Sequence, residues 1–476
     1  MRSSRTVQTL FFTIPLFLGR PAAAQPAPEP APAPPDPGVA VPSAIPAPVP
    51  TATTTDDSSA RARLSDDELD RRIATQLASK PHNSGWNDGF FVESDDGKSR
   101  IKLGGILQFD ARYFPHDDAD PHTDQFAFRT IRPDLSGTLF DHYDFRILPD
   151  FAGGKLVIQE AYADVRYSNA VKLRFGKFKV PFGLERLQLE VATTFVERGF
   201  PTQLAPNRDL GIQLFGELAD DRVEYQVGVF NGVADGQIGD GDVSDDKEVA
   251  ARVFVKPFIT TRTALRGLGV GGAVTYGKKL GTLASPDVAF FRTEGQNTFF
   301  AYKVGTTLDA TAIADGNHLR ATVQGYYYLG PIGVLGEWVR SQQHVAIGTT
   351  KQVHQEVDID AWQAVVQWVI TGDDAGYKSV SPRHPFDPDK GQWGAFDIAA
   401  RFSELIVPGA SVFRAGLADP TRSANQARAA TVGVDWFLNK NVRLALDYDH
   451  AWYHRGAKAG DKPDENSIIT RFQTYF

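Results

Sequence analysis

The fold is decided by segments such as Val442-Arg443-Leu444-Ala445-Leu446-Asp447-Tyr448-Asp449, in which apolar residues alternate with polar or small ones. Successive side chains of an extended chain point to opposite sides, so this pattern gives a strand one apolar face and one polar face. The same alternation recurs at residues 143–147, 223–229 and 249–256. From residue 101 onward, the sequence therefore predicts a series of β-strands with two chemically different faces.

The composition favours an all-β protein and excludes several other classes. Aromatic residues make up 11% of the 476 residues and glycines number 43, which suits twisted sheets and their turns. The chain has no cysteine, which excludes disulfides, thiolate metal sites and cysteine nucleophiles. Its formal net charge of -8 argues against nucleic acid as a partner.

Sixteen segments carry the strand pattern. We expect strands at residues 101–113, 126–139, 142–151, 157–167, 171–178, 209–219, 222–231, 247–258, 266–277, 317–329, 332–342, 356–371, 392–404, 427–438, 441–454 and 467–476. Long loops and short turns alternate between them, as in an outer-membrane barrel with an even strand number. The sequence therefore predicts an all-β fold, a sixteen-stranded antiparallel transmembrane β-barrel over residues 84–476, with a short N-terminal helix before it.

Two segments do not fit this scheme. Residues 372–391 form an overlong turn on the short-turn side, and residues 298–302 could be a further strand. We leave residues 298–302 out of the barrel because a seventeenth strand would break the even count. A soluble sandwich would also alternate, but its polar face would meet bulk water.

The N-terminal residues indicate export. Arg2 and Arg5 precede an apolar run at residues 10–18, and Ala22-Ala23-Ala24 offers a cleavage site before Gln25. This pattern is typical of a secretory signal peptide, here residues 1–24. Together with the strand pattern, it predicts a Gram-negative bacterial outer-membrane location for the mature chain.

Two further segments separate the signal peptide from the barrel. Residues 25–60 are rich in Pro and Ala, which favours an extended spacer. Ser65-Asp66-Asp67-Glu68 matches a helix capping box, and the apolar spacing after it predicts a short periplasmic helix over residues 61–80. Such a helix could pair as a brief coiled coil or remain solvated.

Sixteen strands enclose an aqueous lumen rather than a packed core, and such a lumen conducts small solutes. The polar faces of the strands carry nearly equal numbers of basic and acidic residues, so summed charge does not decide selectivity. The basic residues expected along the lumen are Arg132, Arg146, Arg252, Arg320, Arg401 and Arg443.

A basic stretch marks the expected constriction. Residues 172–179 hold four basic side chains and no acidic one, and they lead into a long loop at residues 179–208. Long loops in compact folds are usually functional, and charges at the narrowest section of a pore set its selectivity. We therefore expect an inward, anion-facing loop whose constriction residues are Lys172, Arg174, Lys177, Lys179, Arg186, Arg198 and Arg208. The alternative is that these residues are solvated rim charges or pair locally with Glu185, Glu190 and Glu197.

Several motifs resemble a known family. They are Gly176-Lys177-Phe178-Lys179-Val180-Pro181-Phe182-Gly183-Leu184-Glu185, Phe195-Val196-Glu197-Arg198, Asn207-Arg208-Asp209-Leu210-Gly211, Gly228-Val229-Phe230-Asn231-Gly232, Tyr326-Tyr327-Tyr328-Leu329-Gly330-Pro331, and the segment 433–444. Together they resemble the phosphate-selective porins of Gram-negative bacteria over residues 101–476. The resemblance implies a homotrimeric porin whose lumen carries arginines and whose constriction carries lysines that hold phosphate or polyphosphate. Lys177 and Lys179 stand in the matching motif.

The C-terminal strand supports the same assignment. Ile468, Thr470, Phe472, Thr474 and Phe476 alternate along it, and a terminal Phe resembles the signature that the outer-membrane assembly machinery recognises. The outer face of such a barrel would contact the lipid bilayer and lipopolysaccharide.

No other motif indicates catalysis or a cofactor. Residues 267–272 match GxGxxG but lie within an expected strand, so no helix N-terminus follows to bind pyrophosphate. Acidic residues cluster at 116–124 and 240–246 without the pattern of a calcium loop, and neither HExxH nor GxSxG occurs. We therefore predict no metal, no cofactor and no enzyme activity.

The predicted function is passive diffusion of small anions, with phosphate or polyphosphate as the expected substrate. Three alternatives remain: a general or weakly selective porin, an outer-membrane structural tether that uses the N-terminal spacer, and a soluble exported all-β enzyme.

Overall fold

The computed structural model describes residues 83–116, 120–241 and 244–476. The predicted signal peptide, the Pro/Ala-rich spacer and the short helix at 61–80 lie outside the described residues. Among the described residues, no helix has the length and apolar character needed to cross a membrane.

Sixteen antiparallel strands close into a barrel, as the sequence predicts. They follow one another in chain order around the wall, and the last strand pairs with the first, Ile468 opposite Tyr113 and Tyr475 opposite Ile106. A hairpin of β1 (Ser84–Trp86) and β2 (Phe90–Glu93) adds to the start of β3. The barrel strands are β3 (Arg100–Tyr113), β4 (Gln125–Leu139), β5 (Tyr143–Asp150), β6 (Val157–Arg166), β7 (Lys172–Lys179), β8 (Arg208–Leu218), β9 (Val223–Phe230), β10 (Glu248–Val255), β11 (Leu268–Leu280), β14 (Ala312–Leu329), β15 (Ile332–Ile347), β16 (Val353–Val369), β17 (Ala395–Ile406), β18 (Ala424–Phe437), β19 (Val442–Arg455) and β20 (Glu465–Tyr475).

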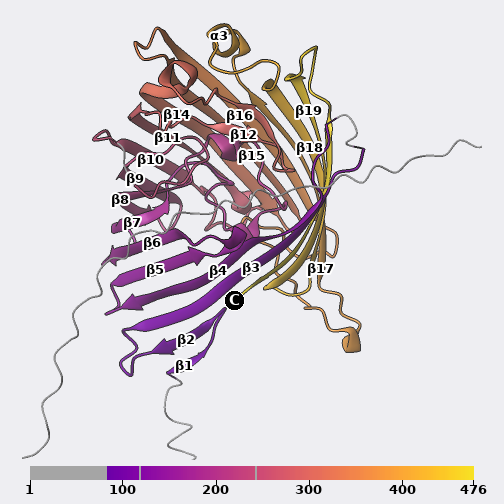
Figure 1. Ribbon diagram of the computed structural model, residues 1–476. Helices are drawn as coiled ribbons and strands as arrows, with labels where there is room; N and C mark the ends of the chain where they lie inside the picture. Colours follow the sequence, from indigo (N-terminus) through magenta and orange to yellow (C-terminus); the bar gives the residue numbers. More distant parts are fainter. Residues whose placement is uncertain (1–82, 117–119, 242–243) are drawn as a thin grey trace, which may run out of the picture. The chain divides into compact units, whose positions relative to one another are not determined.

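The segment set aside in the sequence does not enter the barrel. Thr298–Ala301 forms β13, which pairs with β12 (Phe290–Arg292) in a separate two-stranded sheet. The overlong turn on the short-turn side is also present, between β16 and β17. Figure 1 shows helix α3 (Gly409–Arg414) at the long-loop rim, with β1, β2 and the C-terminus at the opposite, short-turn rim.

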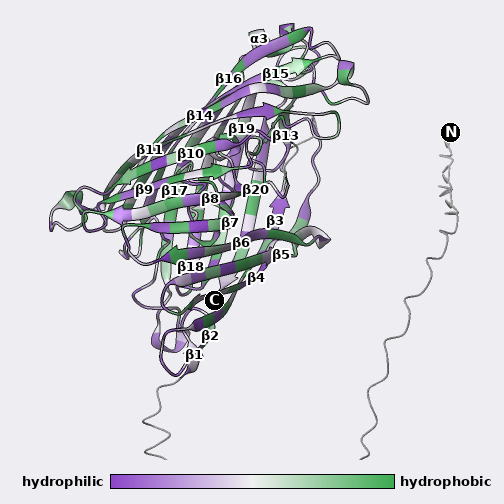
Figure 2. Ribbon diagram, turned by 90° about the vertical axis from the view of Figure 1, so that its left-hand side faces the viewer, coloured by the Kyte–Doolittle hydropathy of each residue, from purple (hydrophilic) through white to green (hydrophobic). Residues whose placement is uncertain are grey.

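The strands differ in length around the wall. β14, β15 and β16 have 18, 16 and 17 residues, whereas β5, β7, β9 and β10 have 8 each. The long strands extend beyond the others at the long-loop rim, near α3 (Figure 2).

The outer face is apolar and the inner face is polar. Along β19, the apolar Leu444, Leu446 and Tyr448 are exposed, whereas Asp447 and Asp449, on the other face, are buried. Figure 2 shows the same alternation of hydrophobic and hydrophilic residues along the strands. A soluble sandwich buries its apolar faces, so this inverted arrangement is that of a protein surrounded by hydrocarbon. Exposed tryptophans, among them Trp338, Trp362, Trp368 and Trp393, fit the aromatic girdles of such barrels.

Loops fill part of the interior. Helix α2 (Pro201–Leu204) and the β12–β13 hairpin form an apolar cluster with the inner side of β15 and β16, in which Phe200 packs edge-on against Phe299. The cavities of the barrel lie elsewhere: three of them, of about 390, 400 and 780 Å³, are lined mainly by β3 to β11 and by the loops inside the barrel. The interior is therefore packed on one side and open on the other.

The inverted polarity predicts a specific sensitivity. Replacing the outward-facing Leu446 by Arg should lower the free energy of unfolding in lipid vesicles by about 2–4 kcal/mol, because a charge on the lipid face must enter hydrocarbon. Urea unfolding followed by tryptophan fluorescence measures this change. Asp389→Arg, at an exposed position in the turn between β16 and β17, is the matched control and should change the free energy by less than about 0.5 kcal/mol. Equal effects of both changes would contradict a lipid-facing wall.

Candidate functional site

The loop between β7 and β8, residues 180–207, crosses the inside of the barrel and binds the opposite wall. Arg401 of β17 donates a hydrogen bond of 2.8 Å to the Glu197 carbonyl, and Arg471 of β20 donates one of 2.8 Å to the Val196 carbonyl. In return, the Val196 amide donates to Asp447 of β19 at 2.7 Å. We call residues 180–207 the inward loop.

These contacts explain why the inward loop folds inside. A loop with little secondary structure leaves backbone groups unpaired, and buried backbone groups need partners. The wall supplies those partners through long side chains: Arg443 also donates to the Thr194 carbonyl at 3.0 Å, and Glu337 of β15 accepts from the Leu184 amide at 2.6 Å.

Three of the arginines predicted to line the lumen are therefore anchors. Arg401 and Arg443 hold the inward loop, and Arg320 holds the loop between β9 and β10 through Asp235 at 2.6 Å and Glu248 at 2.9 Å. All three face the interior, but they are buried: Arg320 is 0% exposed and Arg401 is 3% exposed. They position loops and do not border open space.

Five basic side chains meet at the base of the inward loop. We call Arg132, Lys179, Arg186, Arg198 and Arg208 the basic cluster. Three of them share a single carboxylate, Glu190: Arg132 pairs with it directly, and Arg198 and Arg208 lie 3.5 and 3.9 Å from it.

The remaining contacts of the basic cluster do not neutralise it. Arg132 also contacts Asp150 at 2.8 Å, and Arg208 contacts Glu160 at 3.0 Å. Among the described residues, Lys179 and Arg186 have hydrogen bonds only to backbone carbonyls, those of Gln188 and Thr202. The Nε atom of Arg186 is buried and has no partner among the described residues.

The pKa values of the loop residues are shifted by burial and by the charges around them. Burial, followed by repulsion from Arg198 and Arg208, lowers the pKa of Arg186 to about 9. Burial also lowers the pKa of Arg198 to about 10, although nearby Glu185 acts in the opposite direction. Burial alone would raise the pKa of Glu197, but Arg129 and Arg112 lower it to about 2. An anion placed in this region would therefore be stabilised electrostatically.

A cavity of about 400 Å³ lies beside the basic cluster, on its short-turn side. Lys179 and Arg208 line it together with Arg146 and Arg174. Arg174 forms two hydrogen bonds of 2.7 Å with Asp164, and its guanidinium lies 3.8 Å from the centre of the Tyr162 ring.

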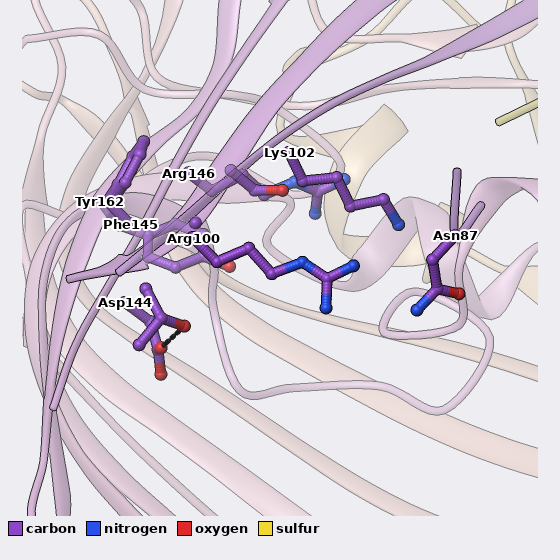
Figure 3. A pocket seen from close by; sticks show the side chains of 10 residues that line it. Asn87, Arg100, Lys102, Asp144, Phe145, Arg146 and Tyr162 are labelled. Atoms are coloured by element: carbon purple, nitrogen blue, oxygen red, sulfur yellow. Dashed lines mark hydrogen bonds between the residues drawn. The ribbon is translucent and has the colours of Figure 1, made fainter. Parts of the chain in front are cut away.

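A second cavity of about 390 Å³ continues toward the short-turn rim. In Figure 3, the side chains of Arg100 and Lys102 extend side by side into this cavity, with Arg146 and Tyr162 behind them. Lys102 and Arg146 line both cavities, and Arg146 bonds two carboxylates of the same lining, Asp134 at 2.7 Å and Glu160 at 3.0 Å.

The predicted constriction residues are thus divided. Lys179, Arg186, Arg198 and Arg208 lie together, and Arg174 lines the adjacent cavity. Lys177 lies apart from them: it is 4% exposed and pairs with Asp240 of the loop between β9 and β10. Lys172 lies near the short-turn rim, 3.7 Å from Glu217, and Arg252 lines a third cavity.

Sequence reasoning missed several contributors. Arg100 and Tyr162 carry no motif. Glu190 was expected only as an alternative local partner of the loop's basic residues; the structure has it beside Arg198 and Arg208 and adds Arg132 from β4. Tyr377 lies in the turn between β16 and β17, and its hydroxyl donates to the Leu184 carbonyl of the inward loop at 2.6 Å. The unusual length of that turn is the feature of the sequence that could have indicated a role for Tyr377. Within the described parts of the chain, no group of His, Asp and Glu residues is arranged to hold a metal ion.

Comparisons with known proteins identify the family and the fold of this chain. A profile of the family described as "Phosphate-selective porin O and P" matches residues 101–476. Porin O of Pseudomonas aeruginosa is 24% identical over 425 residues, which cover 82% of this chain and 91% of that protein. Among solved structures, the outer membrane channel DcaP of Acinetobacter baumannii superposes with a TM-score of 0.52 at 13% identity, over 81% of this chain and 99% of that one; this likeness concerns the fold alone.

The anchoring arginines predict how the inward loop can be released. The double change Arg443→Gln and Arg471→Gln removes the donors to three loop carbonyls, each worth about 1.5–3 kcal/mol when the donor is charged. The loop should move, and the single-channel conductance in planar bilayers should rise and fluctuate. Arg340→Gln, on the outer face, is the control and should leave both unchanged. An unaltered conductance in a double variant that still shows heat-modifiable migration would contradict the anchoring role.

Proposed function

Because the chain belongs to the phosphate-selective porin O and P family, we propose that it conducts phosphate and related small anions by passive diffusion. The chain is an outer-membrane porin of the Gram-negative type, and its family and fold are those of channels. The proposal concerns which solute passes and which residues select it.

The basic cluster is the observation that carries the proposal. Arg132, Arg198 and Arg208 share Glu190, and Lys179 and Arg186 bind only carbonyl groups among the described residues. Charge-assisted hydrogen bonds to a phosphate oxygen would satisfy the donors that the protein leaves free. Arg132 and Arg208 are buried, and salt screens the interaction of buried charges with an anion much less than that of exposed charges.

The position of other basic residues supports a directed path. Arg129 lies beside Glu197, and its side chain is 43% exposed on the long-loop side of the basic cluster. Arg146 and Arg174 follow on the short-turn side, and Arg100 and Lys102 come next. An anion could therefore pass from one cationic group to the next along the wall of β3 to β8, driven only by its gradient.

Further features of the porin belong to the same proposal. We propose a signal peptide cleaved before Gln25, recognition of Phe476 by the assembly machinery, contact with lipopolysaccharide, and a homotrimer. The trimer is supported by the family resemblance of the sequence motifs. In outer-membrane barrels the short turns face the periplasm, so the second cavity would open on that side.

Lys179 and Lys177 provide a sharp test because they are neighbours with different surroundings. Lys179→Gln should raise the phosphate concentration that halves the chloride current by about tenfold, since one charge-assisted contact is worth about 1.4 kcal/mol or more. Lys177→Gln, which removes a lysine already paired with Asp240, should change it less than twofold. Planar bilayers in potassium chloride, titrated with phosphate, measure both values and the reversal potential.

Three results would redirect the proposal. If wild-type current is not reduced by phosphate and the reversal potential shows weak selectivity, the chain is a general porin. If no conductance appears at all, the structural tether is the better explanation. If Lys177→Gln has the larger effect, the anion does not bind at the basic cluster.

The proposed processing is tested on protein purified from outer membranes. Mass spectrometry of the intact protein should give a chain that begins at Gln25, and native mass measurement in detergent should give three copies. A chain that retains residues 1–24 would exclude cleavage, and a monomer that conducts anions would exclude the need for a trimer.

A further inference from the structure

The largest of the three interior cavities, about 780 Å³, differs in chemistry from the basic cavities. It lies below the inward loop, at the short-turn end of β8 to β14, and we call it the aromatic vestibule. Phe254, Tyr326 and Tyr328 of the wall line it, and Tyr377 reaches it from the turn between β16 and β17. The rings form a connected set: Tyr326 lies 5.3 Å from Phe254 and from Tyr328, and it stacks on Tyr377 at 5.1 Å with an interplanar angle of 23°.

Glycines on the neighbouring strand leave room for these rings. Gly269 is paired with Tyr326 in the register of β11 and β14. A Cβ atom at Gly269 would lie 2.7 Å from the rings of both Phe254 and Tyr326, and one at Gly271 would lie 2.6 Å from Phe254. The two glycines therefore allow both rings to lie close against the wall of β11.

One cation sits at the edge of this aromatic surface. The Arg252 guanidinium lies 4.8 Å from the centre of the Phe254 ring. Its nearest acid, Glu224, is 3.7 Å away and is held more closely by Lys256 at 2.6 Å. Arg252 is only 6% exposed, and its Nε atom has no hydrogen-bond partner among the described residues.

An amide group beside Arg252 is unpartnered as well. Gln226 lies directly opposite Arg252 in the register of β9 and β10 and lines the aromatic vestibule, and its buried Oε1 atom has no partner among the described residues. Buried polar groups without hydrogen bonds lower the stability of a protein. Where such groups lie next to an open cavity, they indicate a ligand that supplies the missing hydrogen bonds.

We propose that the aromatic vestibule is a binding subsite for organic anions with a planar ring, of the aromatic carboxylate class. The ring would stack on Tyr326 and Tyr328, which line the cavity, the carboxylate would accept from Arg252, and a ring substituent would bond the Gln226 amide. Inorganic phosphate has no apolar face, so the ring surface offers it nothing. The inference rests on the proposed function, because the anion must first enter through the same lumen.

The test compares two carboxylates that differ in ring shape. Wild-type protein is placed in planar bilayers in potassium chloride, and benzoate or cyclohexanecarboxylate is added from the short-turn side. Benzoate should reduce the current at concentrations about tenfold lower than cyclohexanecarboxylate, which has the same charge but a puckered ring. The double change Tyr326→Leu and Tyr328→Leu should remove this difference while the chloride conductance and the block by phosphate stay as in the wild type.

A control variant separates stacking from general loss of aromatic residues. Tyr276→Leu lies on the outer face of β11 and should leave the benzoate block unchanged. Equal block by the two carboxylates in the wild type would overturn the inference, as would a benzoate block that survives in the double variant. If phosphate also fails to block, the proposed function fails as well. If phosphate blocks and benzoate does not, only this inference is lost.

Discussion

The whole structure depends on one constraint: backbone amide and carbonyl groups that cross hydrocarbon must find all their hydrogen bonds inside the protein. Sixteen strands meet it by closing on themselves, with β20 bonded to β3. The same constraint applies again inside the barrel, where the inward loop lacks a sheet to join. Here the wall supplies side-chain partners instead, and Arg401, Arg443 and Arg471 occupy positions that in a wide pore would point into water.

Arginine thus has two roles in this barrel, and the supply of nearby carboxylates distinguishes them. The anchoring arginines are buried with their own carboxylates, as Arg320 is with Asp235 and Glu248, and they contribute rigidity. In the basic cluster, Arg132, Arg198 and Arg208 share Glu190, and Arg132 and Arg208 each have one further carboxylate. Arg186 bonds only a backbone carbonyl among the described residues, and the proposed role of the cluster is an electrostatic preference for anions. The rigid loop makes that preference useful, because a cluster of like charges disperses unless its backbone is held in place.

The sequence was sufficient to predict the barrel because the alternation of apolar and polar residues is a local signal. All sixteen strands and the overlong turn could be predicted from neighbouring residues, and the exclusion of Thr298–Ala301 followed from the even strand count of such barrels. The pairing of charges could not, because it depends on residues far apart in the chain. Lys177 meets Asp240 sixty-three positions away, and Arg401 meets the Glu197 carbonyl 204 positions away. The motif around Lys177 and Lys179 therefore indicated the region of the basic cluster without distinguishing Lys177, which pairs with Asp240, from Lys179, which bonds a backbone carbonyl.

The unequal strand lengths shape the approach of a solute from outside the cell. At about 3.3 Å per residue, the strands β14 to β16 are longer than β5, β7, β9 and β10 by roughly 26–33 Å. The mouth is consequently oblique: a high wall shields one flank, and the opposite flank is low and leads to Arg129 and the cationic side of the lumen. Solutes would then reach the lumen mainly from the low flank. In an assembly of several barrels, the rotation of each protomer would decide whether the low flanks of neighbouring mouths face the same volume and compete for the same solutes.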